Sequence, residues 1–178
     1  KNCSELNASE VLNLGFNTTN GTLSGLYPSC TLSCNLSSQQ LAADGKSCED
    51  KTPTVSVAFD QAYTKVTTNL ITINYTDGQN LNIYSDSGCT TSILASPLTT
   101  SPVSFNIATS TGDGIKTVYA QVHNGTKHSN CAPASITYDI TNPSVTISSP
   151  ATGSTILSNL VTITGTCTDA TSGVATMD

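Results

Sequence analysis

Apolar and polar residues alternate in short runs through the middle of the chain, the period-2 pattern of half-buried β-strands. Between residues 52 and 141, turn residues separate these runs at the spacing typical of a β-sandwich. The predicted strands are residues 54–59, 70–75, 81–84, 92–95, 103–107, 116–122 and 136–140. We therefore predict one complete sandwich over residues 52–141.

Two turn motifs predict hairpins within this region. Asn124-Gly125 separates two of the alternating runs, and Asn-Gly is the strongest short hairpin signal. The tight connection Asp77-Gly78-Gln79-Asn80 predicts a second hairpin, between residues 70–75 and 81–84.

The opening pattern of the predicted sandwich returns 90 residues later. Pro143–Ile147 matches Pro53–Val57, and Leu160–Gly165 matches Leu70–Tyr75. We expect residues 142–178 to begin a second unit, and two edge strands cannot bury a sandwich core alone. Either the chain is cut from a longer one, which we favour, or the missing strands come from another molecule.

The first 51 residues have a different texture, with four cysteines and several loop-forming residues. Residues 5–16 fit either a short helix or a strand. Four cysteines allow three disulfide connectivities. The turn at residues 43–46 can fold Cys48 back toward Cys34, so we prefer Cys34–Cys48, and Cys3–Cys30 follows by elimination.

The composition excludes several classes of protein. The chain has 30 Thr, 24 Ser and 15 Asn in 178 residues, but only 10% charged residues against about 25% in ordinary domains. It has no Arg and a net charge of −6, which makes a nucleic acid a poor partner. No apolar run reaches the roughly 18 residues of a membrane span.

Seven cysteines indicate folding in an oxidising compartment, either extracellular or at the cell surface. A zinc site is the alternative, since Cys30 and Cys34 have C-x3-C spacing. No second close pair follows them, so disulfides are the better interpretation.

Residues 52–178 resemble bacterial Ig-like domains strung in series in large secreted or cell-surface proteins, many of them adhesins. The motifs that carry this resemblance are Tyr84–Cys89, Asp113–Val122, Asn130-Cys131, Asp139–Pro143, Ser149–Ser154 and Gly165–Asp169. The stretch from Cys34 to Asp50 is similar to the last loop of an EGF-like module. The resemblance implies an all-β fold with Ig-like sandwiches in series after a small disulfide-stapled module at residues 1–51.

The chain departs from antibody-type domains, which join their two sheets through a disulfide packed on a Trp. There is no Trp here, and Cys89 and Cys131 both fall in predicted loops. A Cys89–Cys131 bridge would join two loops at one end of the sandwich. Cys167 then has no partner within residues 142–178.

Candidate sites are few. His123 and His128 flank the Asn124-Gly125 turn, but no third metal ligand accompanies them, and we interpret them as exposed loop residues. Asp113, Asp139 and Asp169 lie near predicted junctions or turns, where carboxylates can hold calcium. Asp also occurs there simply as a turn former, so we expect no cofactor.

No set of residues suggests catalysis, so we do not expect an enzyme. We expect an extracellular structural or adhesion module of a bacterial surface protein that presents or spaces a binding site for a protein or glycan on another surface. One alternative is a subunit of a surface filament, self-associating in a fibre by strand donation. Another is an accessory module of a secreted glycan-active enzyme.

Overall fold

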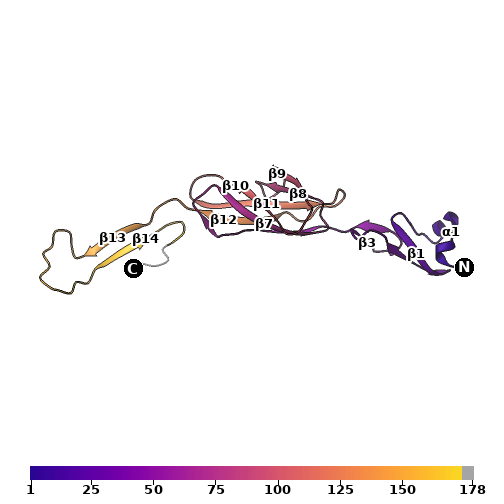
Figure 1. Ribbon diagram of the computed structural model, residues 1–178, viewed down its shortest axis with the longest axis horizontal. Helices are drawn as coiled ribbons and strands as arrows, with labels where there is room; N and C mark the ends of the chain where they lie inside the picture. The colour runs from indigo at the N-terminus through magenta and orange to yellow at the C-terminus, as the bar shows by residue number, and fades with distance from the viewer. Residues whose placement is uncertain (174–178) are drawn as a thin grey trace.

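The chain forms three units in a row in the computed structural model, which describes residues 1–173 (Figure 1). Every sheet of the described residues draws its strands from a single unit. The accessible surface is 11052 Å², whereas a compact monomer of 18.3 kDa exposes about 8,000 Å². The molecule is therefore extended.

The central unit is a β-sandwich, which confirms the predicted all-β class. One sheet has three strands in the order β10-β7-β5, and the other has five in the order β6-β12-β11-β8-β9. The strands are β5 (Thr54–Phe59), β6 (Tyr63–Thr64), β7 (Thr68–Thr76), β8 (Asn80–Tyr84), β9 (Ser92–Pro97), β10 (Val103–Ala108), β11 (Gly114–His123) and β12 (Ala132–Tyr138).

Aliphatic side chains from both sheets fill the space between them. Successive residues of a strand point to opposite faces, so the alternating pattern places one apolar row inward. The completely buried side chains of this core include Ile71 and Ile73 on β7, Leu81 and Ile83 on β8, and Val122 on β11. Phe59, Tyr75 and Phe105 pack at its margin.

The hairpin expected between residues 70–75 and 81–84 is wrong. β7 pairs with β5 on one edge and β10 on the other, so no edge remains for β8. β8 instead pairs with β11 and β9 in the opposite sheet. Residues 77–79 therefore carry the chain across the core, which lets the apolar rows of β7 and β8 pack between the sheets.

The sequence pattern also missed β6. After β5 the chain crosses to the other sheet and pairs in parallel with β12, joining Tyr63 to Thr137 and Thr64 to Tyr138 in the register. Two residues are too few to show a period. The expected hairpin at Asn124-Gly125 is confirmed, because β11 and β12 pair antiparallel on either side of it.

The N-terminal unit combines short helices with two small hairpins. Its elements are a 3-10 helix (Cys3–Glu5), α1 (Ala8–Asn13), β1 (Gly21–Leu26), β2 (Ser29–Cys34), β3 (Gln39–Leu41) and β4 (Cys48–Asp50). The ambiguous segment 5–16 contains α1, which Asn7 caps by accepting a hydrogen bond from the Glu10 amide at 2.9 Å. Neither helix is long enough to cross a membrane.

Three disulfides join the pairs expected from the sequence. Cys3 binds Cys30 and Cys34 binds Cys48 in the N-terminal unit, whose small core contains Cys3, Leu23 and Leu32. Cys89 binds Cys131 at one end of the sandwich. Cys167 is a free, half-buried thiol.

The C-terminal unit is a hairpin of β13 (Ser144–Ser149) and β14 (Thr164–Thr168). Val145 lies opposite Cys167, just as Val55 of β5 lies opposite Tyr75 of β7. The sequence match of Leu160–Gly165 to β7 was therefore wrong by two residues. In the observed register Thr168-Asp169 takes the place of Thr76-Asp77.

Removing the sandwich disulfide will lower stability. In the chain-entropy model, a bridge between residues separated by 42 positions contributes about 4 kcal/mol. We expect Cys89→Ser/Cys131→Ser to lose up to this amount in urea unfolding followed by circular dichroism. Cys167→Ser is the matched control and should not move the midpoint. An unchanged midpoint in the double variant would contradict the assigned role.

Candidate functional site

The two histidines come together as a pair but do not gather further ligands. Their rings stack with centroids 5.2 Å apart, and the backbones of His123 and His128 form a bridge across the turn. Among residues 1–173, no group of three His, Cys, Asp or Glu side chains lies close enough to hold a metal ion. His123 is the half-buried last residue of β11, so the expectation of two exposed loop histidines is wrong for His123, and His128 alone lies exposed in the turn.

Two of the three candidate aspartates meet at the linker that follows the sandwich. Asp113 accepts hydrogen bonds from the Ile140 amide at 2.9 Å and from the Thr141 hydroxyl. These bonds hold the pKa of the Asp113 carboxyl below its usual range. Asp139 is buried and accepts a bond from the Thr141 amide at 3.1 Å. Both carboxylates therefore fix the start of the linker.

The third aspartate serves its own turn. Asp169 accepts hydrogen bonds from the amides of Thr171 and Ser172, each at 3.0 Å, and these amides lower the pKa of its carboxyl. The structure therefore places Asp169 as a local cap after β14.

A cavity of about 400 Å³ lies where the linker leaves the sandwich. It combines the half-exposed ring of Tyr63 with a carboxylate, an amide and an ammonium group. Its lining residues are Gln61, Tyr63, Thr64, Lys65, Val66, Asp139 and Ser172. An aromatic ring beside several hydrogen-bonding groups suits a polar ligand with an apolar face.

The N-terminal unit joins the sandwich through the turn between β11 and β12. Asn124 is only 8% exposed and donates from Nδ2 to the carbonyl oxygen of Lys51 at 2.8 Å. Its Oδ1 accepts from the Lys127 amide at 3.0 Å. One buried side chain thus binds the linker before the sandwich and also shapes its own turn.

Charged groups surround this amide contact. Thr126 donates to the Asp50 carboxylate at 2.6 Å, Lys127 pairs with Glu49 at 3.3 Å, and Lys51 lies 3.8 Å from Asp77. Exposed ion pairs contribute little to stability, so the buried Asn124 bond is the stronger constraint. We call residues 49–51 together with Asp77 and residues 124–127 the joint.

The joint was not foreseen from the sequence. Asn124-Gly125 alone predicts only a turn, because the Lys51 partner of Asn124 lies 73 positions away. No local pattern relates two such positions. A signal was nevertheless present, since Asn offers both a donor and an acceptor where a simple turn needs one.

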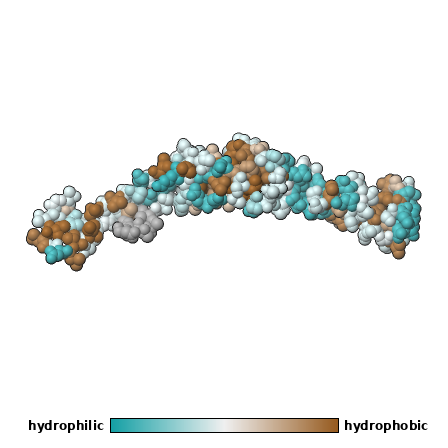
Figure 2. Space-filling view, in the orientation of Figure 1, coloured by the Kyte–Doolittle hydropathy of each residue, from teal (hydrophilic) through white to brown (hydrophobic). Residues whose placement is uncertain are grey.

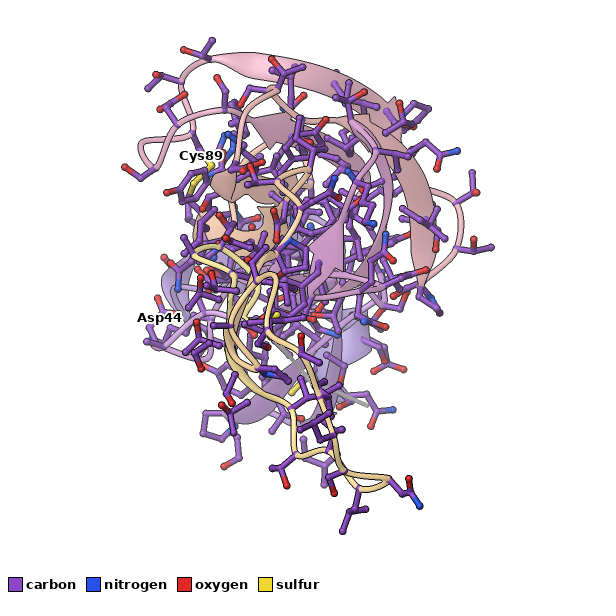
Figure 3. The ribbon with its side chains drawn as sticks, turned by 90° about the vertical axis from the view of Figure 1, so that its left-hand side faces the viewer. Asp44 and Cys89 are labelled. Carbon is purple, nitrogen blue, oxygen red and sulfur yellow. A yellow bond between two sulfur atoms is a disulfide. The ribbon has the colours of Figure 1, made fainter. Side chains whose placement is uncertain are left out.

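The disulfide loop at the end of the sandwich is organised by Asp86. Its carboxylate accepts from the Thr91 amide at 2.6 Å and from the Gly88 and Thr90 amides. The bonds from Thr91 and then Thr90 lower the pKa of the Asp86 carboxyl. Cys89 lies in this loop with a left-handed backbone (φ 52°), and Figure 3 shows the disulfide bond beside it.

Comparisons with known proteins do not assign this chain to a family. No protein-family model matches the chain, and no curated relative was found. A solved PKD domain of an M14-like peptidase from a Thermoplasmatales archaeon is similar at 20% identity, covering 49% of this chain and 92% of that one with a TM-score of 0.32. The Ig-like sandwich assignment rests on the strand pairing described above.

Loss of the Asn124 amide will loosen the joint. Asn124→Ala removes a buried side chain and leaves the half-buried Lys51 carbonyl without its donor, and such a loss costs about 1–3 kcal/mol. We expect ¹⁵N relaxation to show the N-terminal unit and the sandwich reorienting independently in this variant. Asn130→Ala, in the same loop, is the control. Equal behaviour of the two variants would contradict the assignment.

The joint will also weaken in acid. Hydrogen bonds from Gln40 and Lys127 lower the pKa of Glu49, and those from Thr126 and Gln39 lower the pKa of Asp50. A carboxyl group whose pKa is lower in the folded state than in the unfolded state stabilises the folded state at pH values above its unfolded-state pKa. This stabilisation is lost as the pH falls through the folded-state pKa.

We therefore expect the thermal unfolding midpoint to decrease when the pH is lowered below about 4. Carboxyl NMR titration should give both groups pKa values below those of model peptides. Thr126→Val should raise the pKa of Asp50 and leave that of Asp86 unchanged. Ordinary values in the wild-type chain would refute the prediction.

Proposed function

We propose that this chain is an extracellular structural and adhesion module of a bacterial surface protein, in which a row of β units carries a binding surface away from its attachment. The observation that carries this proposal is the joint: a spacer must keep its units at a set angle, and the buried side chain of Asn124 holds two of them through a hydrogen bond.

The disulfides and the surface composition support the proposed extracellular location. Three disulfides form in a small chain with thin cores, and such bridges persist in oxidising environments outside the cell. The surface is rich in Thr and Ser hydroxyls and poor in charge, which favours contact with hydroxyl-bearing ligands at small desolvation cost.

The cavity where the linker leaves the sandwich is the candidate contact site for a glycan. A sugar ring offers an apolar face to Tyr63 and hydroxyl groups to Gln61 and Asp139, which together line the cavity. Ligand sites are frequent at boundaries between units, which is where this cavity lies.

Adhesion can be tested with beads that carry the full chain through an N-terminal tag. We expect them to bind a component of a glycan array and cells that display it. Tyr63→Ala should reduce this binding at least tenfold. Tyr27→Ala is the matched control because the two tyrosines are equally exposed, at 53% and 54%.

Absence of binding to every glycan and every cell surface would refute adhesion. An equal loss in both tyrosine variants would show that the cavity is not the site, while leaving adhesion in place.

A further inference from the structure

The sequence Asn-Gly-Thr occurs twice in the chain, at Asn20 and at Asn124, and the structure gives the two copies different surroundings. Asn is a chemically labile residue, above all before Gly, which has no side chain to hinder attack by its backbone nitrogen. Asn20 is exposed in the loop before β1, whereas Asn124 is buried at the joint. The two asparagines therefore share a local sequence but differ in what must move before they can react.

Loss of ammonia from Asn124 requires only water. The backbone nitrogen of Gly125 attacks Cγ of Asn124 and closes a cyclic imide. The proton of the Gly125 amide passes by way of water to the side-chain nitrogen, which leaves as ammonia. Water then adds to one of the two imide carbonyls and opens the ring. The product is either Asp or an isoaspartate, in which the main chain runs through the side-chain carbonyl and is one atom longer.

The joint holds the reacting carboxamide at both of its polar atoms. Nδ2 of Asn124, which is the leaving group, donates to the Lys51 carbonyl oxygen at 2.8 Å, and Oδ1 accepts from the Lys127 amide at 3.0 Å. The side chain is only 8% exposed, so water has little access to it. Cγ can therefore close on the Gly125 nitrogen only after the carboxamide leaves these partners. Such an opening is a local event with a free energy of its own.

The deamidated product cannot restore this contact. A carboxylate has acceptors only, so it has no hydrogen to donate to the Lys51 carbonyl oxygen. The Thr126 hydroxyl lies 2.6 Å from the Asp50 carboxylate and 3.4 Å from Oδ1 of Asn124, so a carboxylate formed from Asn124 stands close to that of Asp50. Two like charges at such a separation repel each other. An isoaspartate would in addition lengthen the turn between β11 and β12.

The charged groups of the joint do not absorb a further negative charge. It already contains the three carboxylates of Glu49, Asp50 and Asp77 against the two ammonium groups of Lys51 and Lys127. Both ammonium groups are paired, Lys127 with Glu49 and Lys51 with Asp77. Figure 2 shows hydrophilic residues gathered where the sandwich meets the N-terminal unit. Deamidation therefore replaces an attractive contact of the joint with a repulsive one.

We propose that Asn124 is a deamidation site gated by the joint. While the joint is closed, its hydrogen bonds preserve the carboxamide that closes it. When the joint opens, the carboxamide becomes reactive, and one reaction makes the loosening permanent. The row of units thus has a lifetime that is set by how often this joint opens. This inference does not depend on the proposed adhesion.

Peptide mapping by mass spectrometry of the full chain, aged at mildly alkaline pH, tests the gating. Deamidation is slow compared with local opening, so its rate follows the population of the open joint. We expect Asn124 to lose its amide at least tenfold more slowly in the folded chain than in the reduced chain unfolded in guanidinium. A tenfold factor corresponds to about 1.4 kcal/mol of opening free energy.

Asp50→Ala loosens the joint without changing the Asn-Gly-Thr sequence, because it removes the acceptor of the Thr126 hydroxyl. It should raise the rate at Asn124 at least threefold. Glu10→Ala is the matched control, since Glu10 is a carboxylate of the same unit that pairs with Lys1 instead of the sandwich. The rate at Asn20 should be the same in both variants and in the wild type, which shows that the N-terminal unit stays folded.

Thr126→Val removes the same hydrogen bond from the side of the sandwich and does not touch the N-terminal unit. Compared with its own unfolded chain, it should show the same loss of protection at Asn124 as Asp50→Ala.

The permanence of the loosening is tested with Asn124→Asp, which reproduces one product of the reaction. We expect ¹⁵N relaxation to show the N-terminal unit and the sandwich reorienting independently in this variant and in the aged wild-type chain. Asn20→Asp is the matched control and should relax like the fresh wild type.

Equal rates at Asn124 in the folded and unfolded chains would overturn the gating, as would unchanged rates in both Asp50→Ala and Thr126→Val. Failure of Asn124 to deamidate in the unfolded chain would overturn the site itself. Wild-type relaxation in Asn124→Asp would overturn the permanent loosening.

Discussion

Burial of aliphatic side chains between two sheets is the interaction on which the rest of this structure depends. Ile71 and Ile73 on one sheet and Leu81, Ile83 and Val122 on the other are removed completely from water. Each such side chain contributes about 1.5–3 kcal/mol. This core fixes the sandwich, and the sandwich in turn positions both the turn that forms the joint and the linker held by Asp113.

Much of this core could be predicted from the sequence because strand alternation is local. Val55 and Val57, or Val118, Ala120 and Val122, mark their inward faces without reference to any other strand. Which of the two sheets a strand joins depends on distant strands and cannot be predicted from local alternation. The connection at Asp77 reads as a hairpin, yet β7 already has partners on both edges, so the chain must cross to the other sheet. That constraint exists only once all strands are placed.

The candidate sites show the same division between local and distant information. Asp169 acts within its own turn, as a turn-forming Asp would. Asp113 and Asp139 converge on Thr141 because the start of β11 lies beside the end of β12. The contact of Asn124 with Lys51 bridges two units and has no local signature. The repeat of β5 and β7 in β13 and β14 was visible, but its two-residue offset required the observed register.

The three units stand in an extended row, and the joint holds the first two together. Small-angle X-ray scattering, extrapolated to zero concentration to remove association, tests this arrangement most directly. A compact protein of this length has a radius of gyration of about 16 Å, and an unfolded chain of about 45 Å. We expect the extended row of units to give an intermediate value with the distance distribution of a rod. A value near 16 Å would contradict it.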